Sequence, residues 1–405
     1  MSTVAFHNVA LHGHINPTLP VVAELVRRGH SVVYHTTPAF QSEVEGAGAT
    51  VRLYAGGDQA PPDPPTPLGY LENLARIALR VLPAVLADHR HDQPDVIVHD
   101  AACPWGAIAA HELSVPAASS FTTFAFNQHV RSPTSASRDL LLAALAHPIH
   151  SGRYAQARLA LGRRFNARQL PLLDLGDIHQ PLNLVYTSRE FQPAAEALDQ
   201  SYRFVGPSTG ARPPDSSFPM ERLQDPVLYV SLGTVFKADP QLLRTFATAL
   251  APLGGTVVVS TGQTRPDALA PLPPNVVVRQ TVPQVDLLRR AALFITHGGM
   301  NSVNEAMYAG VPMLVVPQGA DQPMVASRIA ELGNGLAIRT QDVTEATVRA
   351  RARELLHDEQ YRSAAATMRI AQRKAGGSRR AVDELEDYLR ATGRRTVGTR
   401  TNPGA

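Results

Sequence analysis

Two side chains that could move a proton follow two expected strands in the first half of the chain. The motif His12-Gly13-His14-Ile15-Asn16-Pro17 follows an apolar run from Val4 to Val9, and Asp100 follows the run from Asp95 to His99. The carboxyl ends of parallel strands meet at one edge of a sheet, so His14 and Asp100 could be neighbours. A carboxylate on one ring nitrogen fixes the tautomer of an imidazole and raises the basicity of the other nitrogen. Either residue alone would be better explained as a turn or a helix cap, but together they are a candidate general base.

A second group of polar residues lies between Thr281 and Gln322. A short apolar run, Leu293 to Thr296, is followed by His297-Gly298-Gly299 and then by a helical pattern from Met300. Glycines let the backbone approach a ligand, and a helix N-terminus offers N–H groups and a positive dipole end to phosphate. His297, Asn301 and Ser302 lie near the helix start, where their hydrogen-bond donors suit a diphosphate. Glu305 lies one turn later, where its carboxylate suits the ribose hydroxyls. Asp321 and Gln322 follow the next strand and suit the hydroxyls of the sugar.

A helix cap and a strained turn would explain the glycines, Asn301 and Ser302 of this stretch without any ligand. They would not explain His297, Glu305 and the Asp-Gln pair together. We therefore favour a phosphate-type site.

Metal chemistry is a rival interpretation of the first motif. His12 and His14 form an H-x-H pair of the kind that holds a metal in hydrolases built on a closed barrel. That fold would need further histidine ligands on later strands, and a phosphate-type second half argues against it. No D-x-D triplet occurs in the sequence, so a metal held that way on a diphosphate is not expected either. We expect no metal and no cofactor.

The composition is that of an ordinary globular protein. The chain has 405 residues, of which 44% are hydrophobic and 18% charged, so it can form two domains with separate cores. The net charge is +3, and the only dense basic segment is a solvated tail from Arg390 to Arg400, so nucleic acid is not an expected partner. The lone Cys103 suits a reducing compartment and a place in an apolar core. Without a secretory leader or a run long enough to span a bilayer, the sequence predicts a cytoplasmic protein with no stable membrane anchor.

Strand and helix patterns alternate in both halves, which predicts an α/β fold with two open, doubly wound parallel sheets. In the first half we expect a helix from Pro17 to about Arg28 with Asn16 as its N-cap, and a helix from Leu68 to His89 that is kinked or broken at Pro83. The strands are expected at Val4–Val9, Ser31–Thr36, Thr50–Leu53, Asp95–His99, Val115–Ser119, Leu182–Thr187, Tyr202–Val205, Val227–Ser231, Thr256–Ser260, Asn275–Val278, Leu293–Thr296 and Met313–Val316.

Breaks in this alternation predict the domain boundaries. Residues 55–67 are rich in Gly, Pro and Asp and are expected to form a loop, and 121–180 contain no clear strand. The segment 206–219 carries four prolines and resembles a linker. The expected parts are a first domain, a linker, a second domain, a final helix and a flexible tail: 1–205, 206–219, 220–377, 378–393 and 394–405.

The assembled motifs resemble the inverting UDP-glycosyltransferases of the GT-B architecture, and within them the bacterial macrolide glycosyltransferase group. The resemblance covers nearly the whole chain and is strongest in H-G-H-I-N-P and in the stretch from Thr281 to Gln322. Such a long ordered signature is far more specific than a lone glycine-rich loop. It implies two Rossmann-like domains that face each other across a cleft, with a final helix that crosses back to the first domain.

The resemblance also implies a role for each matching residue. His14 matches the catalytic base and Asp100 its orienting partner. The other matching residues are contacts to the nucleotide-sugar donor. Gln284 matches the contact to the base, Glu305 the contact to the ribose, and Asp321 and Gln322 the contacts to the sugar. The diphosphate contacts match Gly233 and Thr234 in one turn and His297, Gly298, Gly299, Asn301 and Ser302 in another.

One position departs from the family pattern. The tryptophan that stacks on the nucleotide base in the family is replaced by Thr281, so stacking is expected from the backbone around Val282. Relatives that use TDP-deoxysugars often carry a paired histidine and lack the asparagine, whereas this chain has Thr296-His297 and Asn301-Ser302. This difference favours a UDP-sugar, and UDP-glucose is the donor that we expect.

The acceptor is expected to be a hydrophobic hydroxylated small molecule such as a macrolide, polyketide or flavonoid. Phe121, Phe124 and Phe126 could line its pocket or belong equally well to the core. The resemblance thus implies an inverting, metal-independent glycosyltransferase of antibiotic biosynthesis or resistance, acting as a monomer or weak homodimer. The alternatives are a TDP-deoxysugar glycosyltransferase, a UDP-N-acetylglucosamine 2-epimerase-like enzyme and, outside this fold, a metal-dependent hydrolase.

Overall fold

The chain forms two compact units. A computed structural model describes residues 1–54, 56, 66–126, 130, 147–165, 167, 170, 175–209, 218–233 and 238–397. Unit 1 comprises Met1–Tyr186, Ala194–Gly210 and Gly376–Ala405, and unit 2 comprises Thr187–Pro193 and Ala211–Ala375. The short segment Thr187–Pro193 thus leaves the first half and packs with the second, which no feature of its sequence indicates.

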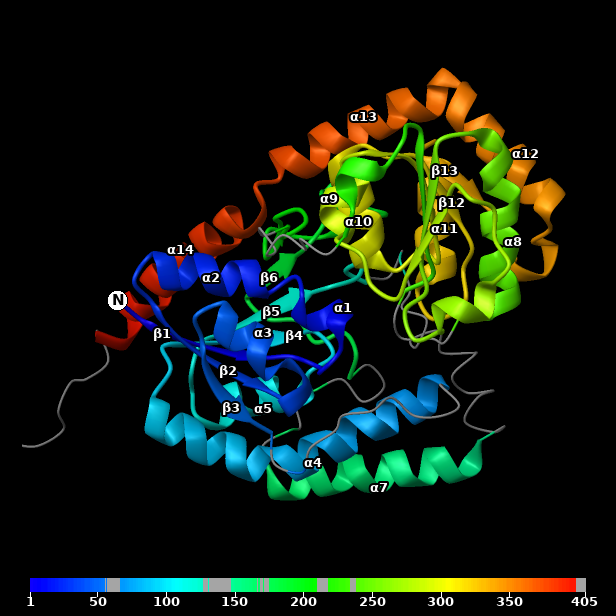
Figure 1. Cartoon of the computed structure of the whole chain (residues 1–405). Coiled ribbons are helices and arrows are strands. Elements are labelled where there is room, and N and C mark those ends of the chain that lie inside the picture. The colour runs from blue at the N-terminus through cyan, green and yellow to red at the C-terminus, as the bar shows by residue number, and fades with distance from the viewer. Residues whose placement is uncertain are drawn as a thin grey trace, which may run out of the picture. The chain divides into compact units, whose positions relative to one another are not determined.

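Unit 1 is built on a seven-stranded sheet in the order β3-β2-β1-β4-β5-β6-β7 (Figure 1). Every pair of neighbouring strands is parallel. Strands covered on both faces contain almost only buried residues, and all five residues of β4 are buried. The strands are β1 Thr3–His7, β2 Ser31–Thr36, β3 Thr50–Leu53, β4 Val96–Asp100, β5 Ala117–Phe121, β6 Leu182–Val185 and β7 Tyr202–Phe204.

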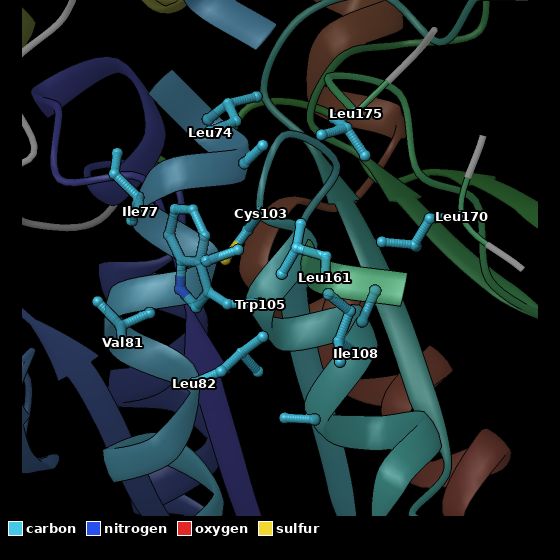
Figure 2. Close-up of a cluster of buried hydrophobic side chains, with 14 of the residues drawn as sticks. Leu74, Ile77, Val81, Leu82, Cys103, Trp105, Ile108, Leu161, Leu170 and Leu175 are labelled. Atoms are coloured by element: carbon cyan, nitrogen blue, oxygen red, sulfur yellow. The ribbon is translucent and has the colours of Figure 1, made fainter. Parts of the chain in front are cut away.

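Helices α4, α5 and α7 enclose the larger apolar core of unit 1. Figure 2 shows Trp105 and Cys103 between side chains of α4 and α7, including Leu82 and Leu161. Cys103 is fully buried, as expected for a small core residue. The helices of unit 1 are α1 His12–Ile15, α2 Leu19–Arg27, α3 Gln41–Gly46, α4 Pro67–Asp92, α5 Pro104–Glu112, α7 Pro148–Arg164 and α14 Gly377–Val397, with 3-10 turns η1 Pro38–Phe40 and η2 Ala195–Ala197.

The expected break at Pro83 is wrong, because α4 continues through this residue. Proline removes one helical hydrogen bond and opposes the turn before it. Pro83 lies on the exposed side of α4, however, while Leu82, Val85 and Leu86 are buried in the core. Packing of this apolar face therefore outweighs the local cost of the proline.

Unit 2 contains a six-stranded, fully parallel sheet in the order β10-β9-β8-β11-β12-β13. The expectation of two parallel α/β sheets is confirmed, with β13 and α9 as additional elements. The strands are β8 Val227–Ser231, β9 Thr256–Ser260, β10 Val276–Arg279, β11 Ala291–Thr296, β12 Met313–Val315 and β13 Gly335–Ala337. The helices are α8 Pro240–Leu250, α9 Gln284–Leu288, α10 Met300–Ala309, α11 Gln322–Glu331, α12 Glu345–His357 and α13 Glu359–Lys374, with 3-10 turns η3 Met220–Arg222, η4 Ala251–Leu253, η5 Pro266–Leu269 and η6 Thr340–Asp342.

Several segments that were expected to be irregular are described only in part. Most of the expected loop 55–67 and residues 210–217 of the expected linker lie outside the described residues. Within 121–180 the described part includes the long helix α7. The last helix continues to Val397, four residues into the segment expected as a tail, and 398–405 lie outside the described residues.

Across the residues that the structure describes, no helix combines the length and the apolar character that a bilayer span requires.

The C-terminal helix α14 packs against α2 within unit 1. Ala381, Val382 and Leu385 are buried in one cluster with side chains of α2. Arg28, just after α2, donates to Asp383 Oδ1 (2.7 Å) and Glu386 Oε2 (2.9 Å) of α14, and its Nε donates to Glu24 Oε1 (2.8 Å). Apolar packing and the hydrogen bonds of Arg28 therefore hold the C-terminal helix α14 against α2.

Replacing the shared cation, Arg28→Ala, should destabilise unit 1 by about 1–2 kcal/mol, because it leaves three carboxylates without their common partner. Trp105 is the only tryptophan of the chain and is fully buried in unit 1, so its fluorescence during urea unfolding reports on this unit. The matched control is Arg222→Ala, since the ion pair of Arg222 with Glu221 is exposed (83% and 75%). Equal urea midpoints for the two variants would contradict the proposed role of Arg28.

Candidate active site

The structure brings His14 and Asp100 together at the carboxyl edge of the first sheet. Asp100 is the last residue of β4, and its Oδ2 lies 2.7 Å from Nδ1 of His14 in α1. The other oxygen, Oδ1, accepts a hydrogen bond from the N–H of Ala102 (2.7 Å). The Asp100 side chain is 2% exposed and that of His14 is 22% exposed. A buried carboxylate with both oxygens bonded thus orients a partly accessible imidazole through Nδ1.

The turn that carries His14 differs from the expected one. Residues His12–Ile15 form a single helical turn that ends at Asn16, and α2 begins only at Leu19. The expected helix is present but begins two residues later than Pro17, and the expectation of Asn16 as its N-cap is wrong. The buried side chain of Asn8 donates to the His14 carbonyl (3.0 Å), and Thr18 donates to the Ile15 carbonyl (2.8 Å), so side chains hold the backbone between the two helices.

The H-x-H pair is not arranged as a metal site in the described part of the chain. His14 bonds Asp100, and the His12 ring packs edge-on against Phe40 with centroids 4.8 Å apart. The only described group of three close metal-type ligands is a different one, and it contains neither residue.

In unit 2, two glycines make room for the imidazole of His297. Gly233 follows β8 and Gly299 caps α10. A Cβ on Gly233 would lie 2.7 Å from His297 Cε1, and a Cβ on Gly299 would lie 2.4 Å from His297 Nε2. Gly233 and Gly298 also have φ values of +84° and +88°, which side-chain-bearing residues rarely adopt. The turns after β8 and β11 thus meet around one imidazole.

His297 is neutral in this setting. Burial lowers the pKa of His297 to about 4, although the backbone of Ser231 opposes the shift. A neutral imidazole has one N–H to donate and carries no charge to neutralise a diphosphate. The positive end for an anion would come instead from the N-terminus of α10, which begins after Gly299 without a side-chain cap.

Gln284, Ser302 and Glu305 form a polar cluster beside this helix start. Gln284 Nε2 lies 2.7 Å from Glu305 Oε2 and 3.3 Å from Ser302 Oγ, and Gln284 Oε1 accepts from the Tyr229 hydroxyl (2.8 Å). Tyr229 in turn stacks on Phe294, with ring centroids 4.7 Å apart. Three of the residues expected to contact base, ribose and diphosphate are therefore close together and held by a buried tyrosine.

The loop after β12 lies against the same turns. A Cβ on Gly298 would be 3.4 Å from the Gln322 carbonyl oxygen. Gln322 is 5% exposed, and its Oε1 accepts from the N–H groups of Gln318 (2.7 Å) and Gly319 (3.1 Å). The side-chain oxygen of Gln322 therefore holds the backbone of this loop.

The other predicted donor residues have these positions. Asp321 immediately precedes α11, Asn301 is in the first turn of α10, and Val282 is half-buried before α9. Thr234 lies outside the described residues.

The phenylalanines proposed for the acceptor pocket are core residues in this structure. A side chain that lines an open pocket keeps accessible surface, but Phe121 and Phe124 are 1% and 0% exposed and Phe126 is 7% exposed. Phe121 packs with Val185 and Leu198, and its ring stacks on His179. The burial of these side chains agrees with the core alternative, and a role in the acceptor pocket stays a prediction.

A network of buried side-chain hydrogen bonds holds α10 through Asn304, and the sequence alone did not predict it. Asn304 Oδ1 accepts from Thr187 Oγ1 (2.7 Å) and from Gln372 Nε2 (3.1 Å), and Gln372 Oε1 accepts from the Ser188 N–H (3.0 Å). All four residues are buried within unit 2. The only signal in the sequence is an asparagine on the apolar face of a predicted helix, which does not identify its partners.

Comparison with known proteins identifies the family. A family model described as UDP-glucoronosyl and UDP-glucosyl transferase matches residues 214–374. NDP-glycosyltransferase YjiC of Bacillus subtilis (strain 168) is 31% identical over 396 residues, which cover 96% of this chain and 97% of that protein. Oleandomycin glycosyltransferase of Streptomyces antibioticus is also 31% identical, and the match covers 99% of this chain and 94% of that protein.

Solved structures agree with the sequence relatives. CalG4, the calicheamicin glycosyltransferase, superimposes with a TM-score of 0.78 at 31% identity, covering 97% of this chain and 99% of that one. The glycotransferase of kitacinnamycin gives a TM-score of 0.84 at 28% identity, covering 96% and 99%. The chain therefore belongs to the UDP-glycosyltransferase family and is a GT-B glycosyltransferase of the natural-product type, an enzyme that uses a nucleotide-sugar donor and a small-molecule acceptor.

Proposed function

We propose that this enzyme transfers glucose from UDP-glucose to a hydroxyl of a hydrophobic natural product, with inversion and with His14 as general base. The observation that carries the proposal is the 2.7 Å contact between His14 Nδ1 and Asp100 Oδ2. The carboxylate of this pair is buried, and the His14 ring is partly exposed. We also propose a cytoplasmic location, because the single cysteine suits a reducing compartment.

The reaction is a single displacement. Nε2 of His14 accepts the proton of the acceptor hydroxyl while its oxygen bonds to the anomeric carbon, and the bond from that carbon to the diphosphate oxygen breaks with its electron pair on UDP. Asp100 stabilises the imidazolium that forms, because its carboxylate is fixed on the opposite ring nitrogen. An α-linked donor then gives a β-glycoside.

Unit 2 binds the donor and stabilises the leaving group. The N-terminus of α10 and the N–H of neutral His297 face the negative charge that develops on UDP, which is how fixed dipoles assist such a departure. Gln284 and Glu305 are already hydrogen-bonded to each other (2.7 Å), so the nucleoside pocket is preorganised. No step requires a metal ion.

The choice of donor and acceptor is supported by sequence and by relatives. Asn301-Ser302 at the start of α10 favours UDP over TDP, and the matching family model is described as UDP-glucoronosyl and UDP-glucosyl transferase. Two relatives bear names of natural products, oleandomycin and calicheamicin. We therefore propose a hydrophobic hydroxylated acceptor such as a macrolide, a polyketide or a flavonoid.

The proposal is tested by mass spectrometry of reactions with UDP-glucose, UDP-N-acetylglucosamine and TDP-sugars against a panel of macrolides and phenols. The expected product is the acceptor plus one hexose residue, formed from UDP-glucose with or without a chelator. Products from TDP-deoxysugars alone would overturn the donor assignment. Isomerised sugar nucleotide in the absence of any acceptor would indicate an epimerase instead.

Removing the base should abolish turnover but not donor binding. General-base catalysis contributes about 10²–10⁴ in rate, so His14→Ala should lower kcat by that factor while the Kd for UDP remains within twofold. The control is His12→Ala, two residues earlier on the same turn, whose exposed ring contacts Phe40 rather than Asp100. A large loss of kcat in His12→Ala and none in His14→Ala would exclude the proposed base.

Filling the space beside His297 should weaken nucleotide binding. In Gly299→Ala the new methyl would lie 2.4 Å from Nε2 of His297, so the imidazole or the helix start must move. Overpacking of this size costs about 1–3 kcal/mol, so we expect the Kd for UDP to rise about 5- to 150-fold by isothermal calorimetry. Gly162→Ala in α7, where a Cβ meets no atom within 4 Å, should bind UDP normally. Wild-type affinity in Gly299→Ala would show that UDP does not use this turn.

The contribution of His297 to donor binding should be independent of pH in the neutral range. Because its pKa is lowered to about 4, the imidazole is already neutral at pH 8 and stays neutral at pH 6, so no attractive charge appears on acidification. The ratio of UDP-glucose Kd values for His297→Asn and wild type should therefore exceed one and stay constant from pH 8 to pH 6. A ratio that grows as the pH falls would mean that His297 binds the diphosphate as a cation.

A further inference from the structure

Three histidines meet inside unit 1, away from the residues assigned to catalysis. His7 ends β1, His35 lies opposite it in the register of β2, and His89 is in the last turn of α4. They are 0%, 1% and 1% exposed, respectively. One ligand atom from each lies within 4.8 Å of the other two, so three elements far apart in sequence bring their imidazoles to one point.

The contacts among these rings leave hydrogen-bonding capacity unused. His7 Nε2 lies 2.6 Å from His89 Nε2, so one ring must donate and the other accept, and the His7 and His35 rings stack with centroids 4.4 Å apart. Nδ1 of His35 and Nδ1 of His89 are buried and have no hydrogen-bond partner among the described residues. Buried polar atoms without a partner are rare in native proteins, and a bound water or ion is a common reason for them.

The protonation state of the cluster suits a metal ion. Burial lowers the pKa of His7 and His35 and lowers that of His89 to about 4, with mutual repulsion adding to the shifts of His7 and His89. All three imidazoles are therefore neutral at pH 7. Neutral imidazole, with its lone pair available, is the form that coordinates zinc.

The outer contacts also match those of a metal site. Nε2 of His35 lies 3.2 Å from Asp88 Oδ2, and Nδ1 of His7 lies 3.2 Å from the Tyr54 hydroxyl. Histidine ligands are commonly oriented by a carboxylate or another polar group on their second ring nitrogen. The carboxylate of Asp88, whose side chain is 34% exposed, also supplies negative charge to this site. This charge would offset part of the positive charge of a buried divalent cation.

We propose that His7, His35 and His89 bind one zinc ion that stabilises unit 1 and takes no part in sugar transfer. Zinc–nitrogen bonds of 2.0–2.1 Å in a tetrahedral site place two ligand nitrogens about 3.3 Å apart. The ion would replace the proton shared by His7 and His89 and widen their 2.6 Å contact accordingly. Three protein nitrogens leave the fourth position of the tetrahedron to a water molecule.

The site can be tested by metal analysis of the full-length chain without a polyhistidine tag, expressed with added zinc and then desalted. We expect one zinc per chain by inductively coupled plasma mass spectrometry in the wild type, and almost none in His89→Gln and His35→Gln. The matched control is His91→Gln, the same substitution two residues along α4 at an exposed position, which should retain one zinc. Asp88→Asn should weaken zinc binding about 10–100-fold in a competition titration with a chromogenic chelator.

Two further measurements keep the proposal falsifiable if the ligand variants do not fold. Removal of zinc from the wild type and from His91→Gln should lower the melting temperature of both, and added zinc should restore it. His12→Ala and His14→Ala should keep their zinc, because neither residue belongs to the cluster. Wild-type protein that binds no zinc, loss of zinc in His12→Ala, or full retention in His89→Gln would each overturn the assignment.

Discussion

In the mechanism that we propose, unit 1 depends for its function on the hydrogen bond between His14 and Asp100. It can form only because β4 is paired in parallel with β1 and with β5, which places its last residue at the edge where the chain leaves β1. The carboxylate is buried, so it needs both of its bonds, one to His14 and one to the Ala102 N–H. The same two bonds that satisfy the buried charge fix the position of the imidazole.

In the same proposal unit 2 meets a different physical requirement, since it must present hydrogen-bond donors to a diphosphate without burying a charge of its own. It does so with a helix N-terminus and with a neutral histidine, and it creates the necessary space by placing glycine at 233 and 299. Behind this surface the buried amides of Asn304 and Gln372 hold α10 in place. Rigid support behind an anion site reduces the reorganisation required when charge develops on the leaving group.

Much of the fold could be predicted from local sequence. Strands such as Ser31–Thr36, Thr50–Leu53, Val227–Ser231 and Thr256–Ser260 have the expected bounds, because each is a short run that contains valine, a residue that favours strands. The pairing of His14 with Asp100 followed from their positions at strand ends, and the gathering of Gln284, Ser302 and Glu305 followed from the resemblance to the family.

The features that escaped prediction depend on contacts distant in sequence. The helix break between Ile15 and Leu19 is set by buried Asn8, and the continuity of α4 through Pro83 is set by the core beneath it. Whether Phe121 faces a pocket or the core depends on β6 and on His179. Likewise the meeting of His7 with His35 needs the register of two strands, which periodicity alone does not give.

The stereochemistry of the product tests the central claim most directly. If His14, held by Asp100, deprotonates the acceptor for one direct displacement, the glucoside formed from α-linked UDP-glucose must be β. The proton NMR spectrum of the purified product should then show the large coupling between H1 and H2 that two axial hydrogens give. A small coupling, from an α-glucoside, would contradict the account, because retention requires a different mechanism from a single base-assisted attack.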